Sequence, residues 1–218
     1  MPLLSSLALV ALVLLGGGAR QPAPTPTAKD IADRLQKKYD SIRDFSADFV
    51  HRHEGGPLKR IREERGSLLV KKPGKMRWTY KQPEEKVFVS NGVRYFQYIP
   101  ADRQVVIADP PDEREPAMTF LAGKGDLTRD FTVAFVQAQP PDRWTLRLDP
   151  KDAQQQYDWL EISASRESFE LRTLVVAEKQ GSRSTFTFTN LKANPGLADK
   201  EFEFTIPKDV EVVNASKH

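Results

Sequence analysis

The first half of the chain alternates short runs of β-forming residues with turn signals. Between the runs lie the sequences Lys-Pro-Gly, Gln-Pro-Glu and Asn-Gly, which are typical of tight turns. Strands are therefore predicted at residues 67–71, 76–80, 86–89 and 93–99. Runs this short with such close turns favour a continuous antiparallel meander, and we take it as the centre of the fold.

One face of this meander is predicted to be rich in large apolar side chains. Met76, Trp78 and Tyr80 alternate with polar residues, so they project from the same side of their strand. Phe96 and Tyr98 are expected to face the same way from a neighbouring strand. Lysine and arginine side chains form a basic rim beside this face, and most of them are interpreted as solvated.

Two helices are predicted to flank the meander. The first has Thr27 as N-cap and Asp30 at its third position, followed by Ile31 and Leu35 at helical spacing. The second spans residues 115–125, where a proline suits the first turn and glycines end the helix. The second helix is either a movable cover for the apolar face or a permanently docked connection.

The remaining patterned segments also read as strands with turn-length separations. They lie at residues 45–50, 105–108, 131–136, 144–148, 159–163, 171–178, 185–189 and 202–206. Together with the meander they give roughly eleven strands, a number typical of a closed or nearly closed barrel. A barrel of this size encloses a cavity unless helices plug it.

The N-terminus predicts export. Residues 3–15 form an apolar run that is too short to span a membrane but suits a signal peptide, and small residues follow it. We expect a signal peptide at 1–19 with cleavage after Ala19, a proline-rich linker at 20–27, one domain at 28–213 and a tail at 214–218. A retained N-terminal anchor is the alternative.

Composition and motifs argue against most catalytic classes. The chain has no cysteine, which excludes disulfides and thiolate chemistry, and its net charge of +3 does not call for nucleic acid. Phosphate-loop, GxSxG, HExxH and EF-hand patterns are absent. His51 and His53 alternate on one strand, but two imidazoles are too few for a metal site, so we interpret them as exposed and unmetallated. The sequence therefore predicts neither an enzyme nor a cofactor.

An exported chain with an apolar cavity and a basic rim suits fatty acyl chains as guests. Burying each methylene contributes about 0.8 kcal/mol, so several long chains would together give tens of kcal/mol. A carrier that retained all of this free energy would never release its load. It needs a loose site, or a lid whose closed empty state competes with the guest.

The ordered motifs resemble the periplasmic outer-membrane lipoprotein carriers of the LolA family. They are F-x-x-x-F from Phe45, G-x-L-x-V-K-K-P from Gly66, R-W-x-Y-x-x-P from Arg77, V-S-N-G from Val89, Y-x-P from Tyr98 and F-x-F-x-x-P from Phe202. The resemblance implies an incomplete, strongly curved antiparallel β-barrel whose helices form a lid over an apolar cavity. It also implies a monomeric, non-enzymatic carrier of acylated lipoproteins, from an ATP-driven ABC transporter in the inner membrane to an outer-membrane receptor.

The resemblance also implies roles for particular residues. Lys72 falls where the family has an arginine that holds the lid, and lysine lacks the planar fork of arginine. His51 falls where the family often has glutamine. The residues expected to bind lipid are Leu68, Val70, Met76, Trp78, Tyr80, Phe96, Tyr98, Met118 and Leu121.

Two other functions stay open from the sequence. A sensory or regulatory domain of the same barrel type would bind lipid and act through a partner protein. A hydrolase would need a catalytic carboxylate, and no pair of acidic residues stands out. The lipoprotein carrier is the hypothesis that the ordered motifs favour.

Overall fold

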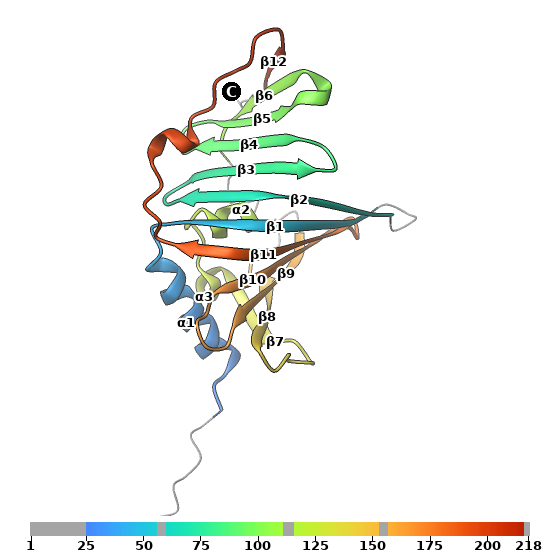
Figure 1. Ribbon diagram of the computed structural model, residues 1–218. Coiled ribbons are helices and arrows are strands. Elements are labelled where there is room, and N and C mark those ends of the chain that lie inside the picture. The colour runs from blue at the N-terminus through green and yellow to red at the C-terminus, as the bar shows by residue number, and fades with distance from the viewer. Residues whose placement is uncertain (1–24, 56–59, 111–115, 153–156, 216–218) are drawn as a thin grey trace, which may run out of the picture.

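The computed structural model describes residues 25–55, 60–110, 116–152 and 157–215. The expected signal peptide and its cleavage site lie outside these residues. Figure 1 shows a large curved sheet with helices on one side of it.

Twelve strands form one sheet in the order β12-β6-β5-β4-β3-β2-β1-β11-β10-β9-β8-β7. The strands are β1 (Asp44–Gly55), β2 (Arg60–Lys71), β3 (Lys75–Gln82), β4 (Lys86–Asn91), β5 (Tyr95–Ile99), β6 (Gln104–Ala108), β7 (Phe131–Phe135), β8 (Arg143–Pro150), β9 (Tyr157–Ser165), β10 (Leu171–Glu178), β11 (Arg183–Ala193) and β12 (Glu211–Asn214). All neighbours are antiparallel except β12 and β6. The sheet has two edges, which confirms the incomplete, curved β architecture.

The α-helices of the described residues lie on one face of the sheet (Figure 1). They are α1 (Ala28–Asp40), α2 (Pro116–Leu121) and α3 (Leu127–Asp130); two 3-10 helices, η1 (Pro100–Asp102) and η2 (Asp199–Phe202), occur elsewhere. The predicted start of α1 is confirmed, because the Thr27 hydroxyl accepts from the Asp30 N–H at 3.2 Å and the Asp30 carboxylate accepts from the Thr27 N–H at 2.9 Å. This reciprocal capping satisfies two amide groups that a helix start leaves without partners.

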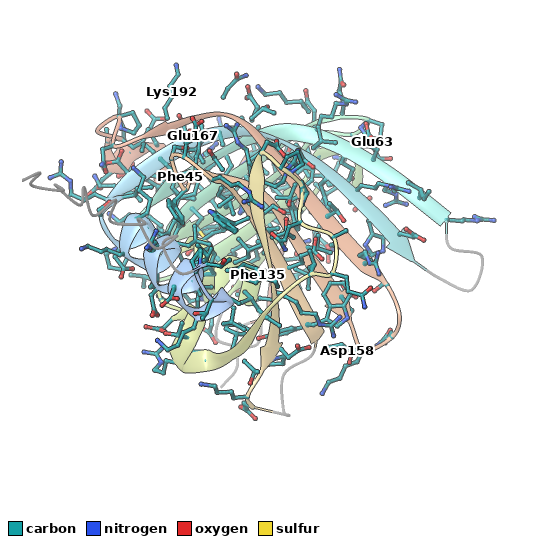
Figure 2. The ribbon with its side chains drawn as sticks, turned by 90° about the horizontal axis from the view of Figure 1, so that it is seen from below. Phe45, Glu63, Phe135, Asp158, Glu167 and Lys192 are labelled. Carbon is teal, nitrogen blue, oxygen red and sulfur yellow. The ribbon has the colours of Figure 1, made fainter. Side chains whose placement is uncertain are left out.

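The helix-covered face of the sheet, called here the inner face, contains the main core. Alternate residues of β1, β2 and β3 project from it, among them Phe45, Phe49, Leu68 and Trp78, all buried. Figure 2 shows Phe45 between the sheet and α1, whereas Lys192 projects away from the molecule. The interior that a barrel would leave empty is thus filled by helices and side chains.

The opposite face, called here the outer face, has a smaller core of its own. Val89, Val105 and Ile107 pack there with Phe204 from the C-terminal segment. The Arg77 guanidinium donates to the carbonyls of Glu201 and Glu203 at 3.3 and 3.2 Å. The C-terminal segment therefore crosses the outer face of β3 to β6.

This crossing corrects the strand predicted at residues 202–206. Phe202 is the last residue of η2, and the extended residues that follow it pair with no strand. Their alternating pattern has another cause, because Phe202 is buried and Phe204 packs on the outer face. The last strand is instead β12, which the sequence pattern did not indicate.

The structure also corrects the face assigned to Phe96 and Tyr98. Phe96 pairs with Val89, and Val89 pairs with Arg77, so Phe96 shares the outer face with Arg77. The rings of Phe96 and Tyr98 lie 5.4 and 5.9 Å from that of Phe204. Directly paired residues project from the same side of a sheet, so both side chains point away from the inner face. Neither can line a site on that face.

Candidate functional site

The inner face of β2 and β3 is almost wholly apolar at the end near the helices. Leu68 and Val70 alternate along β2, Met76 and Trp78 alternate along β3, and all four are nearly inaccessible to solvent. Val70 pairs directly with Met76, and Leu68 with Trp78. The alternation in sequence therefore brings these side chains into one continuous apolar surface.

Aromatic rings extend this surface along the strands. The ring of Phe49 lies 5.0 Å from that of Trp78 and 4.9 Å from that of Tyr80, both in edge-to-face geometry. Phe186 of β11 lies 5.3 Å from Trp78. Such contacts between rings add to the free energy of simple apolar burial. The result is a broad aromatic floor contributed by β1, β3 and β11.

The helices on the inner face form the lid, defined here as α1 together with residues 119–124. Tyr39 joins its two parts, because its ring stacks on Phe120 at 4.6 Å and its hydroxyl donates to the Leu121 carbonyl at 2.6 Å. The Gly74 N–H donates to the Ala122 carbonyl at 3.2 Å and ties the lid to the turn after β2. The lid is thus held by apolar packing and a small set of polar contacts.

Lys72 contacts both parts of the lid. Its ammonium donates to the Tyr39 carbonyl in the last turn of α1 and lies 3.5 Å from the centre of the Tyr39 ring. A cation at a helix C-terminus is favourable, and the ring face attracts it as well. The methylenes of Lys72 lie against Gly123, where a Cβ would come within 2.4 Å of Lys72 Cδ. Burial lowers the pKa of Lys72 to about 8, although the Asp40 carboxylate acts in the opposite direction.

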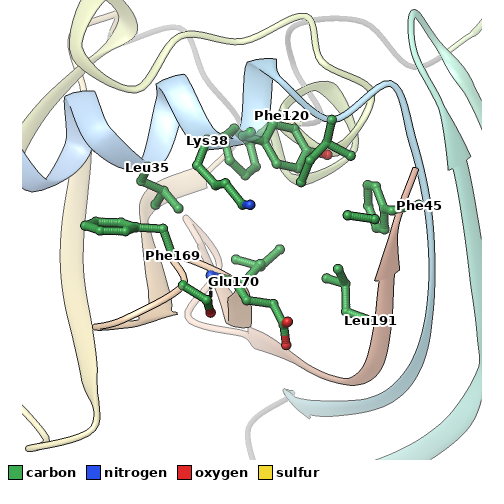
Figure 3. Close-up of a pocket in the computed structure, with 12 residues that line it drawn as sticks. Leu35, Lys38, Phe45, Phe120, Phe169, Glu170 and Leu191 are labelled. Carbon is green, nitrogen blue, oxygen red and sulfur yellow. Dashed lines mark hydrogen bonds between the residues drawn. The ribbon is translucent and has the colours of Figure 1, made fainter. Parts of the chain in front are cut away.

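A small apolar cavity of about 90 Å³ remains under the lid (Figure 3). Figure 3 shows Leu35 and Phe120 on one side of it, Phe45 and Leu191 on another, and Phe169 near Leu35. A cavity of about 150 Å³ holds one benzene molecule. The cavity under the lid is therefore too small for a long acyl chain.

The far end of the inner face carries a charged cluster, defined here as His51, Glu64, Tyr80 and Lys86. The Lys86 ammonium donates to the Glu64 carboxylate, with side chains only 13% and 9% exposed. His51 Nδ1 lies 3.5 Å from the same carboxylate and 3.3 Å from the Tyr80 hydroxyl. Buried charges require such pairing to offset the loss of water. The inner face is thus apolar at the lid end and charged at the other.

The His51 side chain is only 14% exposed in this cluster, which corrects the interpretation that it is an exposed histidine. Its ring stacks on Phe186 with centroids 4.2 Å apart. Burial lowers the pKa of His51 to about 4, and the Glu64 carboxylate only partly opposes this effect. The imidazole is therefore neutral at pH 7.

The depressed pKa of His51 predicts acid sensitivity. The unfolded chain binds this proton near pH 6.5 and the folded protein only near pH 4, so the free energy of unfolding falls as the pH drops through that window. Between pH 7 and pH 4.5, the free energy of unfolding of the His51→Gln variant should fall by about 2 kcal/mol less than that of the wild type. Urea unfolding at both pH values measures this difference. His53→Gln is the control, and equal losses in wild type and His51→Gln would contradict the assignment.

The structure brings together six of the residues expected to bind lipid. They are Leu68, Val70, Met76, Trp78, Tyr80 and Leu121, all buried in the main core. Met118 belongs to α2, but its side chain lies outside the described part of the chain. Sequence reasoning missed Phe120, Glu64 and Lys86 as members of the site. The alternation of Glu64 with Gly66 and Leu68 along β2 was the available signal for Glu64.

Two observations bear on the kind of site. Within the described ranges, no group of three or more histidine, cysteine or acidic side chains could hold a metal ion. None of the helices in those ranges is long and apolar enough to cross a membrane. What the inner face offers is enclosed apolar surface beneath a lid, the kind of surface that shields apolar groups from water.

Comparison with known proteins identifies the family. The family model described as outer membrane lipoprotein carrier protein LolA matches residues 40–205, and the chain belongs to the LolA family. Proteins of this family are periplasmic carriers and not enzymes.

Individual relatives agree with this assignment. The chain is 30% identical to an outer-membrane lipoprotein carrier protein of Chromohalobacter salexigens over 84% of this chain and 86% of the relative. It is 30% identical to the carrier of Bordetella avium over 96% of this chain and 95% of the relative. An uncharacterized conserved protein from Thermus thermophilus shares the fold with a TM-score of 0.54, at 15% identity over 86% of this chain and 98% of that one.

Proposed function

We propose that the protein is a periplasmic carrier that shields the acyl chains of lipoproteins on its inner face. It accepts them from an ATP-driven ABC transporter of the inner membrane and delivers them to an outer-membrane receptor. The observation that carries the proposal is the continuous apolar inner face beneath a lid held by few polar contacts. The family match supports a carrier over the sensory alternative.

The proposed acyl site consists of the inner-face residues and the underside of the lid. Its members are Leu68, Val70, Met76, Trp78, Tyr80 and Leu121, with Lys72 as the contact that holds the lid. Because the cavity is only about 90 Å³, cargo enters by displacing the lid and taking over its apolar contacts.

This exchange accounts for reversible binding. An acyl chain of about a dozen methylenes contributes on the order of 10 kcal/mol when buried. In the structure, Tyr39 and Phe120 pack in the same core cluster as the inner-face residues, and they would give up these contacts to cargo. Only the difference between the two states appears as affinity for cargo. A closed empty state thus makes the carrier able to release its load.

The proposed location follows from the expected signal peptide. A chain exported and cleaved after Ala19 would begin with the proline-rich linker and continue into a single domain. Such a protein acts as a monomer that moves between two membranes, and its partners are the acylated lipoprotein, the transporter and the receptor.

The function is tested with the protein lacking residues 1–19. Spheroplasts that retain an acylated lipoprotein in the inner membrane are incubated with the purified protein, and the lipoprotein in the supernatant is measured. We expect release to a level similar to that given by a carrier already known to work in the assay. A lipoprotein that stays membrane-bound while the known carrier releases it would argue against the proposal.

Lys72 provides a test of the lid. We expect Lys72→Leu to change the rate of lipoprotein transfer several-fold while lowering the free energy of unfolding by only about 1 kcal/mol, because one charge-assisted hydrogen bond is lost. Lys71→Leu is the matched control, since the Lys71 ammonium contacts Asp199 at 2.7 Å and the Leu197 carbonyl at 2.8 Å instead. Transfer kinetics and urea unfolding give the two readouts. Unchanged transfer by Lys72→Leu would remove the proposed role.

A further inference from the structure

Two buried nitrogen atoms on the inner face lack a hydrogen-bond partner among the described residues. They are Nε1 of Trp78 and Nε2 of His51. Buried polar atoms in folded proteins are almost always paired, and each exception calls for an explanation. Both atoms belong to the face proposed to receive cargo, so the explanation can be sought in the ligand.

The first atom is a hydrogen-bond donor, and the second is a donor in one of the two neutral tautomers of the imidazole. The indole Nε1–H of Trp78 can only donate. For His51, the Tyr80 hydroxyl lies 3.3 Å from Nδ1 and has a proton to donate. If Nδ1 carried the ring proton instead, the buried phenol of Tyr80 would itself lack an acceptor. The Glu64 carboxylate, 3.5 Å from Nδ1, acts in the opposite direction. We take the tautomer in which Nδ1 accepts from Tyr80 and Nε2 carries the proton, so that the inner face presents two N–H groups.

The two side chains come from different cross-strand rows of the inner face, because Trp78 pairs with Leu68 and His51 pairs with Glu64, but they share one contact. Phe186 lies against both side chains, 4.2 Å from the His51 ring and 5.3 Å from the Trp78 ring. On one side of them lies the apolar surface under the lid, and on the other lies the ion pair of Glu64 and Lys86. The polarity of the inner face thus changes between Trp78 and His51.

We propose that Trp78 Nε1–H and His51 Nε2–H bind the ester or amide carbonyls that join acyl chains to the cargo. This inference rests on the proposed function and specifies how cargo is oriented. A pure hydrocarbon offers no acceptor and would leave both donors unpaired. A carbonyl supplies a neutral acceptor at the boundary between the chains and the polar part of the ligand, and the ion pair faces that polar part.

The test compares two lipids that differ only in a carbonyl group. They are 1-hexadecanoyl glycerol, an ester, and 1-hexadecyl glycerol, an ether, and their dissociation constants are measured by displacement of an apolar fluorescent dye. We expect the wild type to bind the ester about five to ten times more tightly than the ether. In Trp78→Phe or His51→Phe this ratio should fall several-fold, and in the double variant it should approach one.

Matched substitutions control for the loss of a ring nitrogen elsewhere. Trp159→Phe alters a tryptophan that lies 4.5 Å from the Arg147 guanidinium, outside the aromatic floor, and His53→Phe alters a histidine whose Nδ1 lies 3.1 Å from the Ser184 hydroxyl. Both should keep the wild-type ratio. A ratio near one in the wild type, or a ratio unchanged in Trp78→Phe and His51→Phe, would overturn the inference and leave the carrier function standing. Failure of the wild type to bind either lipid would overturn both.

A second measurement follows lipid binding in the wild-type protein alone. In ¹⁵N-tryptophan-labelled protein, the indole N–H signal of Trp78, assigned by elimination with Trp144→Phe and Trp159→Phe, should move downfield with the ester and not with the ether. The indole signals of Trp144 and Trp159 serve as internal references. An identical response of the Trp78 signal to both lipids would overturn the inference even if the variants fold poorly.

Discussion

The Met76→Glu variant is expected to lose about 4 kcal/mol of the free energy of unfolding and most of its capacity for acyl chains. Met76 is 2% exposed. Its cross-strand neighbours are Val70 and Ser90, and the Ser90 hydroxyl already donates to the Gly74 carbonyl at 2.8 Å. A carboxyl group there has no ready partner, whether the lid is closed or an acyl chain lies against it.

Met76→Leu is the matched control for this prediction. The two side chains are similar in volume and both apolar, so the substitution should cost less than about 1.5 kcal/mol and preserve binding. Urea unfolding followed by tryptophan fluorescence measures stability, and transfer of an acylated lipoprotein at equal concentrations of folded protein measures function. Normal transfer by folded Met76→Glu would show that Met76 does not contact cargo.

The free energy of unfolding of the Gly66→Ala variant is expected to be lower than that of the wild type by more than about 3 kcal/mol. A Cβ at this position would lie 2.1 Å from the Thr79 carbonyl oxygen and 2.8 Å from Cζ of Phe49. The pairing of β2 with β3 shifts register between Arg65 and Gly66, where the backbones approach closely. Because the first contact is with backbone, the methyl group cannot be accommodated by a side-chain rotation. The expected effect is disruption of the β2–β3 pairing beneath the aromatic floor.

Gly181→Ala is the control that separates this steric clash from the effect of replacing a glycine by alanine where no clash occurs. Gly181 has a φ of +80°, and no atom of the described residues lies within 4 Å of the place that an alanine methyl group would take, so only the backbone conformation is penalised. We expect a loss of about 1 kcal/mol. Thermal and urea unfolding of the two variants give the comparison. A similar loss in both would show that the sheet adjusts at Gly66 without difficulty.

Local patterns were sufficient to predict much of the fold. The alternation of Met76, Trp78 and Tyr80 predicted a strand with one apolar side, and Thr27 with Asp30 predicted the start of α1. Both signals depend on residues within a few positions of each other. Such local patterns also found the apolar inner-face members of the candidate site that lie on β2 and β3, although they missed Glu64.

What could not be predicted depends on pairing between distant segments. Two strand connections, β3–β4 and β4–β5, separate Phe96 from Tyr80. The lengths of these loops set the pairing register, and a shift of the register by one residue would move the Phe96 side chain to the other face of the sheet. The charged cluster combines side chains from β1, β2, β3 and β4, so it exists only once three registers are fixed. The C-terminal segment alternates like a strand, yet its apolar residues pack on the outer face without pairing.

Tyr39 has a consequence for how the lid opens. Its carbonyl accepts from Lys72, its hydroxyl donates to Leu121, and its ring contacts both Phe120 and Phe45. If only one of the two helices α1 and α2 moved away, the buried Tyr39 hydroxyl would lose its acceptor while most of the apolar packing stayed intact. Partial opening is thus unfavourable, and the two parts of the lid should open as one cooperative unit. Amide hydrogens of α1 and of residues 119–124 should then exchange with solvent at a common rate.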